Sequence, residues 1–140
     1  MSVSDIRRRF NMIGSRWAFT GPVASQIHAA YLGIKSTDPI KTVDIVIHQK
    51  NRDTFYTALE SLDFDFRTEK SSRKILYFKH NTPRQLPVRL ILLDHTPPHM
   101  TYDRRTPVAS LNSMNKTPNV RRMLNFKRAV LRLANLNNVN

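Results

Sequence analysis

Two stretches decide the fold, Arg16-Trp17-Ala18-Phe19-Thr20-Gly21-Pro22-Val23-Ala24 and Thr42-Val43-Asp44-Ile45-Val46-Ile47. The first begins as a short apolar run, which is typical of a buried strand. It ends at Gly21, where a glycine allows a tight turn, and Pro22, a residue favoured at the first helical position. The second stretch is rich in β-branched residues, as strands are. Together they predict a strand, a helix over 22–32 and a second strand.

Periodicity elsewhere adds further elements around this unit. Val88–Leu93 is a near-continuous apolar run, typical of a strand inside a sheet, whereas the proline-rich segment 95–107 predicts irregular structure. Apolar spacing predicts helices over 4–13, 51–62 and 119–136, and two strands of a hairpin over 64–66 and 74–79. We therefore expect one α+β domain, residues 1–140, in which helices flank a mixed β-sheet and the last helix is basic.

Charge is the strongest compositional feature. The 140 residues include 23 Lys and Arg against 10 Asp and Glu, a net charge of +13. Unless the source organism has basic proteins throughout, such an excess indicates an anionic partner: nucleic acid, nucleotide phosphates or an acidic protein. The sequence has no cysteine, which excludes disulfides and thiolate chemistry. It has no apolar stretch of membrane-spanning length and no secretory signal, so we expect no membrane partner and a cytoplasmic location, or a nuclear one in a eukaryote, rather than secretion.

A resemblance to a known family follows from Phe19-Thr20-Gly21-Pro22-Val23-Ala24 and Thr42-Val43-Asp44-Ile45-Val46. This pattern resembles the nucleotidyltransferase superfamily, in particular its small bacterial and phage-defence domains. There, a strand ends in Gly-Ser or Gly-Gly, a helix follows, the next strand carries Asp-hydrophobic-Asp, and a later strand supplies a third carboxylate. The resemblance covers the order of elements from about 17 to 93 and extends loosely through Pro107–Leu111 to the last helix.

The resemblance implies a phosphate site at the first turn. Gly21 matches the family glycine, whose turn brings backbone N–H groups at a helix N-terminus close to a triphosphate. Pro22 stands where the family often has a serine, which removes a hydroxyl and an N–H group. Thr20, Gly21, Ser25 and Arg89 are the candidate phosphate- or nucleotide-binding residues. We expect this turn and the middle of the second strand to border one cleft ringed by cations.

The resemblance also implies a Mg²⁺ site, which this sequence matches only in part. Asp44 matches the second aspartate of the family pair and is the candidate metal ligand, but Thr42 stands at the first position. Arg89 or Ile91 stands at the third, and neither side chain holds a divalent cation. Nucleotidyl transfer by this fold uses two Mg²⁺ ions, which one aspartate and a threonine do not hold. If the protein is active, Asp44 and Asp94 are the candidate catalytic carboxylates.

Several of these residues also have structural interpretations. Gly21-Pro22 is compatible with an ordinary turn, and Asp44 with a buried aspartate paired to an Arg or Lys. Asp94, His95 and His99 are not expected to form a metal site, because nearby prolines and the lack of helical spacing give them no reason to converge. His28, near the apolar stripe of its helix, is expected to pack in the protein.

Two groups of cations are candidate nucleic-acid-binding residues. Tyr77 and Phe78 both lie among the first group, and since adjacent strand residues face opposite ways, only one of these aromatics is free to stack on bases. The last helix also has a predicted core stripe of Val120, Met123, Leu124, Val130, Leu131 and Ala134. Its cations are therefore also compatible with the solvent-exposed side of a helix that packs on the core. The two groups are Arg67, Lys70, Arg73, Lys74 and Lys79 in the hairpin region, and Arg121, Arg122, Lys127, Arg128 and Arg132 in the last helix.

Three functions fit these observations. The first is a nucleotidyltransferase-like protein that has lost transfer chemistry and binds nucleotide or nucleic-acid phosphates through its basic surface. The second is an active Mg²⁺-dependent nucleotidyltransferase with a rearranged carboxylate site. The third is a basic protein-interaction or structural module whose last helix contacts an acidic partner.

Overall fold

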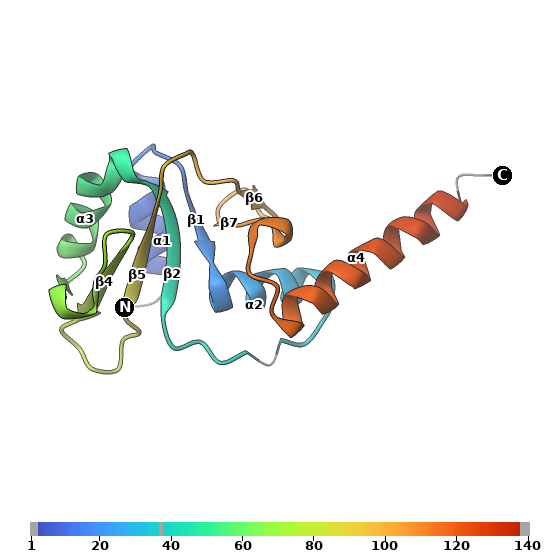
Figure 1. The fold of residues 1–140 in the computed structure, drawn as a ribbon, viewed down its shortest axis with the longest axis horizontal. Coiled ribbons are helices and arrows are strands. Elements are labelled where there is room, and N and C mark those ends of the chain that lie inside the picture. The colour runs from blue at the N-terminus through green and yellow to red at the C-terminus, as the bar shows by residue number, and fades with distance from the viewer. Residues whose placement is uncertain (1–2, 37, 138–140) are drawn as a thin grey trace.

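The fold is α+β, with helices packed on a mixed sheet (Figure 1). The computed structural model describes residues 3–36 and 38–137. The helices are α1 Val3–Asn11, α2 Gly21–Leu32, α3 Arg52–Ser61 and α4 Pro118–Asn137. The strands are β1 Trp17–Thr20, β2 Val43–His48, β3 Phe64–Phe66, β4 Ile75–His80, β5 Val88–Leu93, β6 Met100–Thr101 and β7 Pro107–Val108. No helix of the described residues combines the length and apolar character that a membrane crossing needs.

The described strands form one sheet in the order β3-β4-β5-β2-β1-β7-β6. β2 runs parallel to β5 and β1 parallel to β7, while the other pairs are antiparallel. The expected mixed sheet is thus confirmed. The prediction of irregular structure over 95–107 was wrong at β6 and at the start of β7. These strands have two residues each, too few to carry an alternating pattern, and β7 is fixed by the pairing of Val108 with Phe19.

One face of the sheet is the main hydrophobic core. Ile45 and Leu90 are fully buried on this face, and Phe19 stacks edge-on against Trp17. Helices α1 and α3 cover it, and Phe10 contacts both Trp17 and Phe55 through edge-to-face ring packing. This side accounts for every second residue of the apolar runs of β1, β2 and β5. The opposite face, which we call the polar face, carries Thr20, Asp44 and Arg89 together with the apolar residues of those runs that point away from the main core, Ala18, Val46, Ile91 and Leu93.

The last helix packs on the body only over its first turns. Val120 and Met123 are buried, as the predicted stripe requires. Beyond Leu124 the helix extends away from the rest of the molecule (Figure 1). Val130 and Leu131, predicted to be core, are 47% and 61% exposed. That part of the prediction was wrong, because a helical period shows that a face is apolar but not that another element covers it.

Candidate functional site

A row of four side chains crosses the middle of the polar face. Thr20 of β1 pairs with Asp44 of β2, Asp44 with Arg89 of β5, and Arg89 with Tyr77 of β4. Directly opposed residues on neighbouring strands point to the same side of a sheet. The register alone therefore brings together three residues separated by up to 69 positions in the numbering, from Thr20 through Asp44 to Arg89.

The row ends at the turn into α2, which is packed directly against Asp44. Gly21 has a φ angle of +62°, a conformation that residues with a side chain rarely adopt. A Cβ atom there would lie 2.7 Å from Asp44 Oδ2, closer than real Cβ contacts allow. The glycine is therefore required by both backbone and space. The contact confirms the predicted proximity of this turn to Asp44 of β2.

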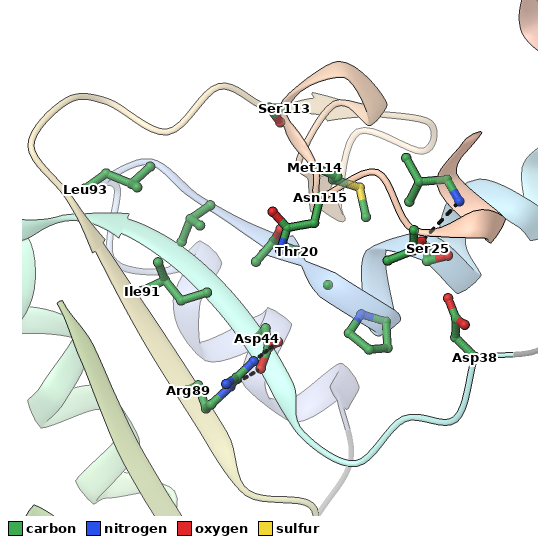
Figure 2. A pocket seen from close by; sticks show the side chains of 15 residues that line it. Thr20, Ser25, Asp38, Asp44, Arg89, Ile91, Leu93, Ser113, Met114 and Asn115 are labelled. Carbon is green, nitrogen blue, oxygen red and sulfur yellow. Dashed lines mark hydrogen bonds and ion pairs between the residues drawn. The ribbon is translucent and has the colours of Figure 1, made fainter. Parts of the chain in front are cut away.

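Asp44 and Arg89 form a bidentate ion pair (Figure 2). Arg89 Nε donates to Oδ1 over 2.8 Å and Nη2 donates to Oδ2 over 2.7 Å. The Asp44 side chain is 5% exposed and that of Arg89 38%. The Asp44 hydrogen bond raises the pKa of Arg89 above its usual range. Thr42 Oγ1 also donates to Oδ1, over 2.8 Å. Both carboxylate oxygens of Asp44 are thus occupied by protein donors, as the structural interpretation of this residue expects.

Beside the ion pair lies a cavity of about 480 Å³ (Figure 2). Ser25 of α2 lines it, and its Oγ is buried with no hydrogen-bond partner among the described residues. All four predicted phosphate-binding residues line this cavity: Thr20, Gly21, Ser25 and Arg89. The full lining is Thr20, Gly21, Pro22, Ser25, Asp38, Asp44, Val46, Arg89, Ile91, Leu93, Ser113, Met114, Asn115, Thr117 and Val120.

The cavity lining is not cationic. Among the described residues that line it, Arg89 is the one cation, and it is already paired with Asp44. Asp38 adds a second carboxylate. The expectation of a cleft ringed by cations was wrong, because the Lys and Arg side chains of the sequence gather on other elements. Phosphate binding inside this cavity would rely on backbone N–H groups at the start of α2 and on Arg89 alone.

Four polar lining residues were not predicted from the sequence. Asp38 comes from the loop before β2, and Ser113, Asn115 and Thr117 come from the segment that leads into α4. Both segments are polar and irregular, so no periodicity marks one side chain above its neighbours. Proximity to Pro107–Leu111, the end of the family resemblance, is the only signal that pointed to this part of the chain.

The structure does not bring Asp94 to Asp44. Asp44 is opposite Arg89, and Asp94 follows five residues later, about 16 Å further along the strand direction. The Asp94 side chain is 85% exposed and accepts a hydrogen bond from His95, which lowers the pKa of Asp94. Asp94 is not among the cavity residues. Within residues 3–36 and 38–137, no group of three or more His, Cys, Asp or Glu is placed to hold a metal ion. Asp44 and Asp94 therefore do not face one pocket.

The two groups of predicted nucleic-acid-binding cations lie at different ends of the molecule (Figure 1). All five residues of the first group are exposed, on β4 and beside it, near one edge of the sheet. Tyr77 lies among it on the polar face with Lys70 Nζ 5.0 Å from its ring centre, whereas Phe78 is buried. We call Arg67, Lys70, Arg73, Lys74, Lys79 and Tyr77 the basic hairpin surface.

The second group lies along α4. Arg121, Arg128 and Arg132 are exposed, while Lys127 is half-buried. Arg122 is exposed but donates to the carbonyl oxygen of Lys35 and to Asn119 Oδ1. The ten candidates therefore form two surfaces rather than one.

Comparison with known proteins identifies the fold. The sequence matches no protein-family model and no curated protein. Solved structures do match, and they show that this chain has the nucleotidyltransferase fold. One is the lincosamide antibiotic adenylyltransferase LnuA with lincomycin bound, at 10% identity and a TM-score of 0.65, covering 91% of this chain and 95% of LnuA. Another is a proposed nucleotidyltransferase from Thermotoga maritima, at 15% identity and a TM-score of 0.50, covering 97% of this chain and 84% of the other.

Proposed function

We propose that this chain is a nucleotidyltransferase-fold protein without transfer chemistry, and that it binds nucleotide or nucleic-acid phosphates through the basic hairpin surface. The observation that carries the first part is the bidentate ion pair between Asp44 and Arg89. A carboxylate whose two oxygens already accept three hydrogen bonds, one of them from Thr42, is poorly available to a metal ion.

The fixed guanidinium also opposes metal binding electrostatically. A divalent cation at Asp44 would lie within a few ångströms of the Arg89 charge, in a partly buried site where repulsion is weakly screened. The active alternative, with Asp44 and Asp94 sharing metal ions, requires these carboxylates to face one pocket. Their separation along the strand and the exposure of Asp94 disfavour it.

The exposed charges support the second part of the proposal. The basic hairpin surface carries five exposed Lys and Arg side chains on β4 and the segments beside it, and Lys70 lies over the ring of Tyr77 on the polar face. Cations that follow a phosphate backbone, combined with an aromatic ring that a base stacks on, are the usual means of binding single-stranded nucleic acid. Arg89 lies directly beside Tyr77 in the register and extends this surface toward the cavity. The names of the two similar structures also associate this fold with nucleotide chemistry.

A transfer assay tests the loss of chemistry. Purified protein is incubated with each radiolabelled nucleoside triphosphate, Mg²⁺ or Mn²⁺, and RNA, protein or small-molecule acceptors. We expect no labelled product above a no-protein control, because Arg89 and Thr42 occupy the oxygens of Asp44 and Asp94 lies away from it. Metal-dependent transfer that Asp44→Asn abolishes would overturn this part of the proposal and favour an active enzyme.

A binding assay tests the surface. Anisotropy of a labelled single-stranded oligonucleotide is measured at about 50 and about 200 mM salt, and we expect affinity to fall steeply with salt. Replacing Lys70 and Lys79 by Ala should weaken binding and reduce the salt slope by about one for each lost contact. The matched control replaces Lys50 and Arg52, two exposed cations near the start of α3, and should leave binding unchanged. Equal loss in both pairs would mean that net charge alone attracts the oligonucleotide.

A further inference from the structure

A second, smaller cavity lies beside the turn between β6 and β7, at the other end of the sheet order from β4 and its basic hairpin surface (Figure 1). Its volume is about 240 Å³. Arg16, the residue before β1, lines it together with Arg104 and Arg105 of the turn. It shares no lining residue with the cavity beside Asp44. Because Arg16 precedes Thr20 by four residues of β1, the two sites are about 13 Å apart along the strand.

The lining of this second cavity is cationic. Three arginines line it, and among the described residues no Asp or Glu does. None of the three takes part in an ion pair between residues that the structure describes. Positive charges around one small volume repel each other, and nothing in the lining offsets that repulsion. The site therefore favours a negatively charged occupant.

The turn that carries Arg104 and Arg105 is held in place by hydrogen bonds. Arg104 has a φ angle of +65°, a conformation that residues with a side chain rarely adopt. The Thr101 hydroxyl accepts from its N–H group, and Asn11 at the end of α1 donates to the Arg105 carbonyl oxygen over 2.8 Å. Asp103, the acid nearest in sequence, uses both carboxylate oxygens for hydrogen bonds inside the turn. The turn is therefore fixed without either guanidinium, and both remain available to a ligand.

His99 adds a polar group that lacks a protein partner. It lines the same cavity, and its Nδ1 is buried with no hydrogen-bond partner among the described residues. A buried polar atom without a partner costs free energy, so such atoms are rare in folded proteins. An oxygen of a bound anion would give this ring a partner once Nδ1 carries a proton.

We propose that this cavity binds a phosphate group. A phosphate monoester carries about two negative charges near pH 7 and presents three acceptor oxygens, and guanidinium groups donate to such oxygens in pairs. A protein carboxylate has one charge and two oxygens, so it would satisfy fewer of these donors. The volume corresponds to about eight water molecules, which leaves room for the phosphate and part of the molecule that carries it. The site does not depend on the basic hairpin surface.

The proposal is tested by titrating the full chain with inorganic phosphate at constant ionic strength and following backbone amide shifts by NMR. We expect the shifts to gather at Ser15, Arg16, Arg104 and Arg105. The double variant Arg104→Gln/Arg105→Gln should weaken phosphate binding at least about tenfold, because it removes two charged donors. The matched control, Arg121→Gln/Arg128→Gln, removes the same charge from exposed positions of α4 and should leave the affinity unchanged.

Competition against inorganic phosphate distinguishes the sources of the phosphate group. A nucleoside 5′-monophosphate represents a small metabolite, and an oligonucleotide with a 5′-phosphate represents a nucleic-acid end. Each is compared with the same molecule without its phosphate, which should not compete. Competition by either phosphorylated probe supports the proposal and identifies its source.

All four substituted arginines are exposed, so both double variants should keep the melting temperature of the natural chain. Three results would overturn the proposal. Equal loss of affinity in the two double variants would mean that net charge alone attracts phosphate. Amide shifts confined to residues 21–25 would place the phosphate at the start of α2 instead. Acetate that binds as tightly as phosphate at the same ionic strength would identify a carboxylate, such as an acidic side chain of a partner protein, as the occupant.

Discussion

At the scale of single residues, Gly21 occupies a position from which both its backbone and its neighbour exclude a larger side chain. Its φ angle is positive and Asp44 fills the space beside it. Gly33 is a natural comparison, because it has a similar φ of +69° at the end of α2 but nothing within 4 Å of its Cβ position. Comparing substitutions at the two glycines therefore separates the cost of backbone strain from the cost of steric crowding.

We expect Gly21→Ala to lower the free energy of unfolding by about 3 kcal/mol and Gly33→Ala by about 1 kcal/mol. Both variants place alanine in the left-handed region, but only the first displaces a carboxylate that Arg89 and Thr42 hold in place. Urea denaturation of the two variants measures the difference. Equal losses would show that Asp44 moves aside without cost, contrary to a rigid site.

The two side chains of the Asp44–Arg89 pair differ in burial, so removing one should cost more stability than removing the other. Removing Arg89 leaves a buried carboxylate without its counter-ion, whereas removing the charge of Asp44 leaves a guanidinium that water already reaches. Arg89→Met should therefore cost about 3 kcal/mol of unfolding free energy and Asp44→Asn about 1 kcal/mol. The double variant should cost less than the two single losses together, since no buried charge remains. Additive losses in this double-mutant cycle would mean that the two side chains do not stabilise each other.

At the scale of elements, His28 ties α2 to the segment that carries β6 and β7. It is fully buried, with Nε2 2.8 Å from the carbonyl oxygen of Ala109 and Nδ1 2.6 Å from the Tyr102 hydroxyl. A carbonyl only accepts, so Nε2 carries a proton. Because burial lowers the pKa of His28, the ring is neutral near pH 7, and Nδ1 then accepts from the Tyr102 hydroxyl. This fits the expected packing role of His28.

His28 gives folding a pH dependence with a definite sign. Burial lowers the pKa of His28, and the charge of Lys127 lowers it further against the Ala109 hydrogen bond. As pH falls below about 6.5, the unfolded chain takes up a proton that the folded chain does not, so stability decreases. Denaturant midpoints between about pH 7.5 and 5 should fall more steeply in the natural protein than in His28→Gln. His95→Gln, at an exposed site, is the control, and an identical slope in His28→Gln would contradict a neutral buried ring.

Some helices and strands could be predicted from the sequence better than others. The apolar runs of β2 and β5 and the Gly21-Pro22 turn were correctly interpreted, because burial in a sheet interior imposes a strong local pattern. β6 and β7 were missed, since strands of two residues depend on pairing with distant residues such as Phe19. The outer half of α4 was assigned to the core, because an apolar period is the same whether its partner is this chain or another.

At the scale of the whole molecule, the sequence pointed to the fold more clearly than to the distribution of charge. The motif spacing made the order of elements accessible, whereas the place of Asp44 opposite Arg89 follows from the strand register, which left Arg89 and Ile91 equally open in the sequence. Where the 23 Lys and Arg side chains gather does not follow from composition. Ten of them lie around β4 and along α4 and the others are spread over further elements, so the cavity is lined by one paired cation and two carboxylates. Folding brings Asp38, Ser113 and Asn115 to that cavity from loops that carry no local signal.

The Asp44–Arg89 pair also constrains how such a chain can change over generations. Under the proposed function, a metal site at Asp44 would require at least a carboxylate in place of Thr42 and the loss of Arg89. If Arg89 is replaced first, the buried carboxylate of Asp44 loses its counter-ion. If the carboxylate at position 42 is introduced first, two negative charges share one guanidinium. Either order of substitution passes through a less stable intermediate. The Asp44–Arg89 pair is therefore easier to keep than to replace by a metal site.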